Sequence, residues 1–277
     1  MVNKFLLEDF IKGAIIEDLN NGDVTTDHLI SDRHISSARM TAKASGVVSG
    51  LFVAEKVFKM IDEEITFHPL VAEGAIVKAG DDILELHGKT KSILKGERLA
   101  LNFMQRLSGI STLTNQLSTL VKDYDVRIVD TRKTTPNLRF LEKAAVKIGG
   151  GHNHRFNLSD AVMIKDNHII AAGGITLAVK KIRENISHTT KIEVEVQNLK
   201  MLKEALEIKA DIIMLDNMSC ETMKEAVKIN NGQSILEASG GITEETIVEV
   251  AKTGVDVISV GALTHSYKSL DISLNIN

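Results

Sequence analysis

The stretch "IEVEVQNLKMLKEALEIKADIIMLDN", residues 192–217, holds two short apolar runs on either side of an amphipathic segment. Runs rich in β-branched residues are typical of buried strands, and apolar residues spaced three and four apart are typical of helices. The same alternation continues from residue 125 onward, with the strand-like runs "VRIVDT", "AVMIKDN", "IEVEV", "DIIMLDN", "SILEASGG" and "VDVISVGA". Strands that alternate with helices predict a parallel α/β architecture with right-handed crossovers.

This half of the chain is too short for a complete barrel. An eight-unit barrel takes about 250 residues, whereas residues 125–277 number 153. We therefore predict an incomplete α/β barrel of six or seven strands over residues 111–265. Residues 1–110 combine helices with strands and glycine turns, which predicts an N-terminal α+β sandwich domain. Residues 266–277 form a C-terminal tail that is free to pack back on that domain.

Composition limits the possible partners. The chain has 277 residues, a formal net charge of -4, an aromatic content of 4% and a single cysteine, Cys220. One cysteine excludes an internal disulfide and favours the cytoplasm, and acidic residues interrupt the apolar N-terminal stretch before a membrane span is reached. We expect no membrane association and, because a global basic field is absent, no nucleic-acid binding.

Charge is nevertheless uneven along the chain. Residues 127–168 carry eight Lys or Arg against four acids, so this segment alone has a charge of +4. A cationic segment in an acidic protein indicates a small, highly anionic ligand that is held locally.

Polar residues follow the predicted strands where each one ends, and they sort by sign. Cations come after the early strands, carboxylates after the middle ones and glycine-rich turns after the last two; they are Arg132, Lys133, Lys165, Glu195, Asp216, Ser239, Gly240, Gly241 and Gly261. The carboxyl ends of barrel strands share one rim, where a glycine turn binds phosphate through its amides. Taken singly, the glycines fit ordinary turns and the acids fit helix caps, but together they predict one site for carboxylates, Mg²⁺ or ribose, and phosphate.

The segment "DTRKTTPNLRFLEKAAVKIGGGHNHRFNLSDAVMIKDNHI", residues 130–169, makes a specific resemblance visible. Together with "GDVTTD", "QRLSGIST", "EVEVQNL", "IIMLDNMS", "EASGGIT" and "GVDVISVGALTHS", it resembles the quinolinate phosphoribosyltransferase family over nearly the full length. The resemblance implies phosphoribosyl transfer from phosphoribosyl pyrophosphate to quinolinate with decarboxylation, giving nicotinate mononucleotide, pyrophosphate and CO₂ in NAD biosynthesis. It also implies Mg²⁺ and a homodimer with shared active sites, or a larger assembly of dimers.

The resemblance assigns roles to individual residues. It implies that quinolinate is bound by Arg106, Arg132, His154, Arg155 and Lys165, and the phosphoribosyl donor by Lys133, Glu195, Asp216, Ser239, Gly240, Gly241 and Gly261. It implies catalytic roles for Lys133, Lys165, Glu195 and Asp216, and Mg²⁺ at Glu195 and Asp216, directly or through water. Arg106 alone reads as an arginine that extends from a core helix to solvent; the resemblance implies instead that it reaches the partner subunit's site.

The sequence also fits two other functions. A related transferase that acts on another aromatic carboxylate has the same fold, and a non-catalytic barrel that senses a phosphorylated metabolite has a similar rim. The intact set of Lys133, Glu195 and Asp216 argues against the sensor. Locally, we predict that Thr134 or Thr135 caps a helix whose first residue is Pro136.

Overall fold

The computed structural model describes residues 2–276, which fall into two compact units. Unit 1 comprises the chain up to Asn115, the segment Phe140–Gly150 and the chain from Ser266 onward; unit 2 comprises Gln116–Arg139 and Gly151–His265. Among the described residues, no helix has both the length and the apolarity that crossing a membrane requires.

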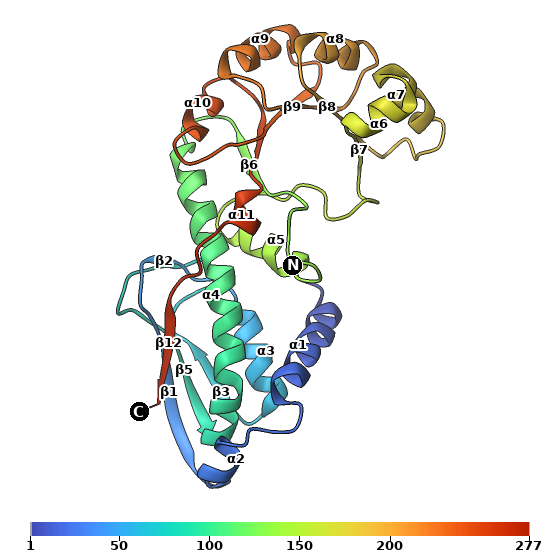
Figure 1. Cartoon of the computed structure of the whole chain (residues 1–277). Coiled ribbons are helices and arrows are strands. Elements are labelled where there is room, and N and C mark those ends of the chain that lie inside the picture. Colours follow the sequence, from blue (N-terminus) through green and yellow to red (C-terminus); the bar gives the residue numbers. More distant parts are fainter. Residues whose placement is uncertain (1, 277) are drawn as a thin grey trace. The chain divides into compact units, whose positions relative to one another are not determined.

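Unit 1 is built on an antiparallel sheet with the strand order β12-β1-β5-β3, and β2 and β4 form a separate short pair (Figure 1). The strands are β1 (Ile35–Ala42), β2 (Gly46–Val47), β3 (Thr66–Pro69), β4 (Ile76–Val77), β5 (Asp82–Lys89) and β12 (Ile272–Ile276). The helices that begin in this unit are α1 (Lys4–Leu19), α2 (Thr26–Leu29), α3 (Leu51–Ile61) and α4 (Thr90–Leu120). Side chains of β1 alternate in burial, as expected for a sheet with one face on a core.

Close packing fixes the helices of unit 1. A Cβ added at Gly96 of α4 would lie 2.7 Å from the Phe58 ring of α3, so these two helices approach each other through the missing side chain. Unit 1 also includes the segment Phe140–Gly150, which contains most of α5 (Arg139–Ile148). Within this unit the Phe140 ring meets the Phe10 ring edge to face, with 5.6 Å between the ring centres. The N-terminal sandwich therefore takes residues from three parts of the chain.

Unit 2 confirms the predicted incomplete barrel. Within residues 2–276 it holds six parallel strands in the order β6-β11-β10-β9-β8-β7, with helices on the outside of the curved sheet (Figure 1). The strands are β6 (Arg127–Val129), β7 (Val162–Ile164), β8 (Ile192–Val196), β9 (Ile212–Asp216), β10 (Ile235–Ser239) and β11 (Val257–Ser259). The helices are α6 (Asp166–Ala172), α7 (Ile175–Arg183), α8 (Leu199–Glu207), α9 (Cys220–Asn230), α10 (Ile247–Ala251) and α11 (Ala262–His265).

Capping side chains mark the N-termini of two of these helices. The side chain of Asn198 accepts from the backbone N–H of Met201 at the start of α8, and that of Ser219 accepts from Thr222 N–H at the start of α9. The sheet stays open because its edge strands, β6 and β7, do not pair with each other. Beside β6 lies a single parallel bridge between Val129 and His152.

The prediction for Pro136 is wrong. Helix α5 begins at Arg139, and residues 136–138 form a turn instead of the first helical residues. Asn137 has a φ of 62°, in the left-handed region that no α-helix contains, so the helix cannot extend back to the proline. Asparagine tolerates this conformation better than most residues, which explains its place in the turn.

Candidate active site

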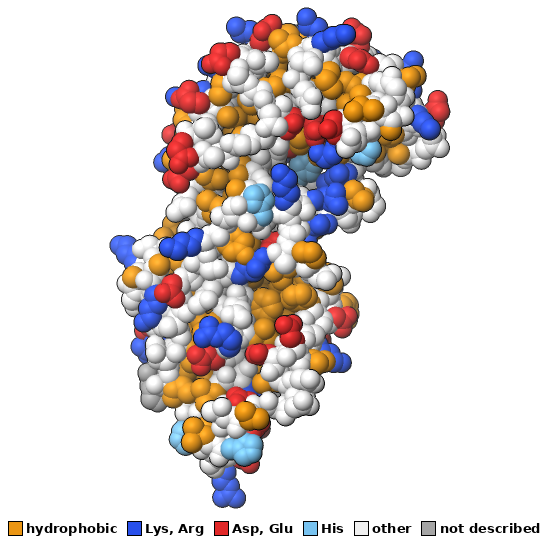
Figure 2. All heavy atoms as spheres, viewed as in Figure 1, with side chains coloured by type: hydrophobic (Ala, Val, Ile, Leu, Met, Phe, Trp, Pro, Cys, Tyr) orange, Lys and Arg blue, Asp and Glu red, His pale blue; other side chains and the backbone are white. Residues whose placement is uncertain are grey.

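A cavity of about 790 Å³ opens in unit 2 where the parallel strands end. Its walls include every site residue predicted from the sequence except Arg106: Arg132, Lys133, His154, Arg155, Lys165, Glu195, Asp216, Ser239, Gly240, Gly241 and Gly261. Lys and Arg side chains gather beside acidic side chains on this face of unit 2 (Figure 2). Residues that lie up to 129 positions apart in the chain thus share one cavity.

The cationic side of the cavity comes from the loop after β6 and the loop before β7. Burial lowers the pKa of Arg155, and the nearby positive charge of Arg132 lowers it further. The Arg155 guanidinium also donates to the backbone carbonyl of Ala161 at 2.9 Å. Two guanidinium groups that repel each other beside a cavity form a site for an anion with several acceptor oxygens.

Arg139 ties these two loops together. Its guanidinium donates to Thr134 Oγ1 at 2.9 Å, to the Phe156 carbonyl at 2.9 Å and to the Arg132 carbonyl at 3.4 Å. One side chain therefore joins the two loops that carry Arg132 and Arg155, which form the cationic wall of the cavity.

The acidic side of the cavity comes from β8 and β9. Lys165 Nζ donates to Glu195 Oε2 at 2.5 Å, and Glu195 is buried while Lys165 is exposed. Asp216, at the end of β9, accepts from the Asn217 side chain at 2.9 Å. The ion pair between Lys165 and Glu195 thus places one cation and one carboxylate at the cavity. A ligand that brings groups of opposite charge would exchange this pair for contacts with itself.

The glycine turn after β10 permits a very close approach of two backbones. Gly240 has a φ of 100°, and a Cβ built there would lie 2.2 Å from Asn217 Oδ1 and 3.0 Å from the Asn217 backbone nitrogen. Asn217 itself has a left-handed φ of 53°, and its N–H donates to the Ser239 carbonyl at 2.9 Å. The backbone of this glycine turn therefore lines the cavity, and such turns are typical phosphate-binding elements in barrels of this kind.

Lys133 is held in place by α11 and by the turn that precedes it. Its backbone carbonyl accepts from Thr264 Oγ1 of α11 at 2.8 Å, and a Cβ added at Gly261 would lie 3.1 Å from Lys133 Cδ. Gly261 thus leaves room for the lysine side chain to pass along the turn after β11. Lys133 and Gly261 both line the cavity.

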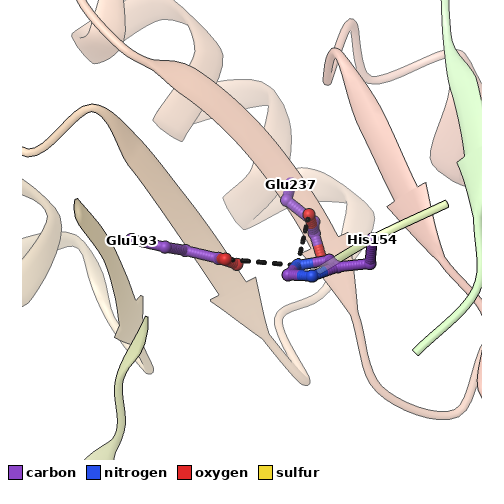
Figure 3. Close-up of side chains that lie close together, drawn as sticks. All are labelled: His154, Glu193 and Glu237. Carbon is purple, nitrogen blue, oxygen red and sulfur yellow. Dashed lines mark ion pairs between the residues drawn. The ribbon is translucent and has the colours of Figure 1, made fainter. Parts of the chain in front are cut away.

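Two buried glutamates and a half-buried histidine in the barrel interior were not predicted from the sequence as a group. Glu193 of β8 and Glu237 of β10 both point at the His154 ring (Figure 3), with Nε2 at 3.1 Å from Glu193 Oε2 and 3.5 Å from Glu237 Oε2. The signal was present, because a glutamate inside a fully buried parallel strand is unusual and needs a partner. Glu193 and Glu195 are two residues apart, so both face the barrel interior, and Glu193 lies in the layer beneath the rim.

Asp130 was quoted from the sequence without a role, and the structure gives it one. This fully buried carboxylate accepts from the Asn153 side chain at 2.6 Å and from the His154 backbone N–H at 2.9 Å. It therefore fixes the loop after residue 151 to the end of β6.

Arg106 lies in unit 1 and outside the cavity of unit 2. Its Nε and Nη2 donate to the buried carboxylate of Glu142 at 3.1 and 2.6 Å, and its guanidinium carbon lies 5.3 Å from the centre of the Tyr267 ring. The Arg106 side chain keeps 31% of its surface exposed. The guanidinium is thus held in a defined orientation with one part open.

The fold and the cavity define an open α/β barrel whose rim brings cationic side chains, carboxylates and a glycine turn into one cavity, as expected of an enzyme that acts on anionic ligands. Family models match in succession: the N-terminal domain of quinolinate phosphoribosyl transferase over residues 23–108 and its C-terminal domain over residues 110–275. The chain belongs to the quinolinate phosphoribosyltransferase family.

Individual relatives agree with the family models. A probable nicotinate-nucleotide pyrophosphorylase [carboxylating] of Bacillus subtilis is 42% identical over 99% of this chain and 95% of its own. Its namesake in Methanocaldococcus jannaschii is 45% identical over 98% of this chain and 99% of its own. The crystal structure of NadC from Streptococcus pyogenes matches with a TM-score of 0.97 and 41% identity, covering 100% of this chain and 98% of that one.

Proposed function

We infer that this protein transfers a phosphoribosyl group from phosphoribosyl pyrophosphate to quinolinate and releases pyrophosphate and CO₂, giving nicotinate mononucleotide for NAD biosynthesis. The observation that carries the inference is the single cavity in which a cationic wall, two carboxylates and a glycine turn meet. Relatives named as carboxylating nicotinate-nucleotide pyrophosphorylases and decarboxylating quinolinate phosphoribosyltransferases support it. The single cysteine, Cys220, supports a cytoplasmic location.

The cationic wall suits quinolinate. This pyridine carries carboxylates on neighbouring carbons, and guanidinium groups match carboxylates in both charge and geometry. Arg132 and Arg155 are the guanidinium groups that line the cavity, and Lys165 adds an ammonium group. We propose that these three cations bind the two carboxylates and leave the ring nitrogen directed toward the donor.

The other end of the cavity suits the phosphoribosyl donor. We propose that the turn at Gly240 and Gly241 holds the 5-phosphate, that Ser239 and Gly261 complete its pocket, and that Lys133 contacts the donor beside Gly261. Glu195 and Asp216 project toward the middle, where ribose hydroxyl groups would lie. The left-handed backbone of Gly240 and Gly241 supports this arrangement, because such conformations are typical of backbone turns that bind anions through their amides.

The carboxylates fit Mg²⁺. Mg²⁺ prefers oxygen ligands and is usually held by one or two carboxylates together with waters and substrate phosphates. Glu195 and Asp216 offer two such carboxylates at the cavity, so they would hold the ion directly or through water. Bound there, Mg²⁺ would neutralise charge on the departing pyrophosphate.

The reaction follows from these positions in two balanced steps. The pyridine nitrogen uses its lone pair to form a bond with ribose C1 while the bond from C1 to the pyrophosphate oxygen breaks, and positive charge develops on the ribose. Glu195 and Asp216 stabilise that charge. The ring nitrogen is then cationic, so the bond to the C2 carboxylate breaks with its electron pair left beside that charge; CO₂ leaves and C2 takes up a proton. The cationic side chains of the wall, Lys165 among them, stabilise the electron pair.

We also propose a homodimer, alone or within a larger assembly of dimers, in which Arg106 reaches the partner subunit's cavity. The division of the chain supports this proposal, because Arg106 belongs to unit 1 whereas the residues that line the cavity belong to unit 2. So does the contact with Glu142, in which Nε and Nη2 both donate to Oε1 and orient the guanidinium while 31% of the Arg106 side chain stays exposed. Two copies related by a two-fold axis would exchange this residue reciprocally.

Pyrophosphate release with quinolinate, nicotinate and nicotinamide, each assayed with the donor and Mg²⁺, tests the proposed function. We expect turnover with quinolinate alone, because the other two compounds lack the second carboxylate that the cationic wall requires. Turnover of nicotinate but not quinolinate would indicate a related transferase. Thermal stabilisation by ligands without any turnover would indicate a sensor instead.

A further inference from the structure

The segment 151–161 carries His154 and Arg155 into the cavity although it contains no helix or strand. It lies at the open edge of the sheet, between β6 and β7, where no ladder of backbone hydrogen bonds can hold it. Only the isolated bridge between Val129 and His152 joins it to a strand among the residues that the structure describes. Apart from its own hydrogen bond to the Ala161 carbonyl, the Arg155 guanidinium therefore depends on side-chain contacts that hold this segment in place.

One set of contacts acts on the backbone of this segment. Asp130 accepts from the His154 N–H and from the Asn153 side chain, as described above. These bonds fix the path of the chain at residues 153 and 154. Farther along, Arg139 holds the chain at the Phe156 carbonyl. None of these bonds orients the His154 ring.

The second set of contacts acts through the His154 ring. Nε2 faces the carboxylates of Glu193 and Glu237, which approach from β8 and β10 (Figure 3). Nδ1 accepts from the Arg155 backbone N–H at 2.8 Å. The ring therefore connects two strands of the sheet to the peptide group of Arg155.

The environments of the two ring nitrogens act on the protonation of His154 in opposite directions. Burial lowers the pKa of His154, and hydrogen bonds from Nε2 to the carboxylates of Glu193 and Glu237 raise it. A second proton, on Nδ1, would face the Arg155 N–H, so the contact at Nδ1 favours the neutral ring. Burial raises the pKa of Glu193, and the Arg155 charge opposes that shift. The carboxylates at Nε2 and the amide at Nδ1 both favour a ring with its proton on Nε2.

A metal ion explains the cluster less well. His154, Glu193 and Glu237 bring three possible ligand atoms within 4.8 Å of one another. However, an imidazole whose Nδ1 accepts a hydrogen bond carries its proton on Nε2 and has no lone pair there for a metal. A metal on Nε2 would require a proton on Nδ1, opposite the Arg155 N–H.

We propose that Glu193 and Glu237 are positioning residues for substrate binding, which act through the His154 ring to hold Arg155 in the cavity. The proposal rests on the assignment of Arg155 to quinolinate under the proposed function. In this role the two glutamates act on the His154 ring and not on the substrate, although Glu237 also lines the cavity. They replace the strand pairing that the open sheet edge lacks at this segment.

Calorimetric titration of quinolinate and, separately, of phosphoribosyl pyrophosphate with Mg²⁺ tests the proposal on Glu193→Gln, Glu237→Gln and Arg155→Ala. We expect each glutamine variant to weaken quinolinate binding by about tenfold, the order of one lost hydrogen bond to a charged group, and to change donor binding by less than about twofold. Glu204→Gln is the matched control, because Glu204 accepts from Thr176 in the same unit, outside the cavity. It should bind both ligands as the unchanged protein does.

Two further measurements separate positioning from general damage. Added to His154→Asn, the Glu193→Gln change should have little further effect on quinolinate affinity, since contacting residues on one path do not act additively. Nitrogen-15 NMR of His154 should show protonated Nε2 in the unchanged protein and an altered ring in Glu193→Gln. Fully additive losses, or an unaltered ring, would overturn the proposal.

The failures are distinguishable. If Arg155→Ala binds quinolinate normally, the assignment of Arg155 under the proposed function is wrong. If Arg155→Ala loses quinolinate while both glutamine variants bind it normally, the positioning role alone is wrong. Stoichiometric Zn²⁺ or Mn²⁺ binding that Glu193→Gln abolishes would replace it with a metal site.

Discussion

At the scale of single residues, Gly240 is the position where the cavity depends most visibly on the absence of a side chain. Its left-handed φ of 100° and the distance of 2.2 Å from a hypothetical Cβ to Asn217 Oδ1 leave no room for alanine. The Asn217 backbone nitrogen, 3.0 Å away, blocks relief by a simple rotamer change. The turn must therefore move if Gly240 is replaced.

We predict that Gly240→Ala weakens donor binding by more than about tenfold, because the shifted turn withdraws its amides from the 5-phosphate. Quinolinate affinity, measured in the same calorimeter, should change little. Gly232→Ala provides the control, since Gly232 also has a left-handed φ, of 74°, but meets nothing within 4 Å and lies outside the cavity. If Gly240→Ala and Gly232→Ala bind the donor equally well, the proposal that this turn holds the 5-phosphate is wrong.

At the scale of elements, the N-terminus of α3 has an unusual cap. Its N-cap residue, Gly50, has no side chain, and the Glu73 carboxylate accepts from the Gly50 backbone N–H instead. Burial raises the pKa of Glu73, although hydrogen bonds from the amides of residues 50–52 oppose the shift. Burial outweighs the favourable helix terminus here.

A carboxyl whose pKa is raised on folding binds its proton more tightly in the folded state. Its contribution to stability is therefore present at low pH and lost as pH rises through the folded pKa. We predict that the unfolding free energy of the unchanged protein falls relative to Glu73→Gln as pH rises from about 4 to about 8. Urea unfolding across this range measures the difference, with exposed Glu17→Gln as the control. If the unfolding free energy of the unchanged protein instead rises relative to Glu73→Gln over this range, the burial argument is wrong.

The elements also show what the sequence can and cannot predict. The parallel strands of unit 2 were predictable because each apolar run is short, β-branched and followed by a polar residue or glycine, as in "DIIMLDN". The start of α5 was not, since nothing in "TTPN" states that Asn137 takes a left-handed conformation. The partners of Glu193 were also beyond prediction, because His154 reaches it from a loop whose path depends on Asp130.

At the scale of the whole molecule, the shared-site proposal predicts complementation between two inactive variants. Arg106→Ala and Lys133→Ala would damage different halves of each site, since one residue lies in unit 1 and the other lines the cavity of unit 2. In a mixed two-fold dimer, one site carries both defects and the other carries neither. Random pairing makes half of the dimers mixed, so about a quarter of the unchanged activity should return.

Refolding the two variants together and assaying quinolinate turnover measures this recovery. Each variant refolded alone is the control, and native mass spectrometry shows whether mixed dimers form. If mixed dimers form and activity stays at the level of the separate variants, Arg106 does not act in the partner's site.

The central claim is that one cavity both transfers the phosphoribosyl group and removes a carboxylate from the same substrate. Quinolinate labelled at its C2 carboxylate, incubated with the protein, phosphoribosyl pyrophosphate and Mg²⁺, tests this claim most directly. The account predicts one labelled CO₂ for each pyrophosphate released, with nicotinate mononucleotide as the product. Pyrophosphate release without labelled CO₂, or label retained in the nucleotide, would contradict it.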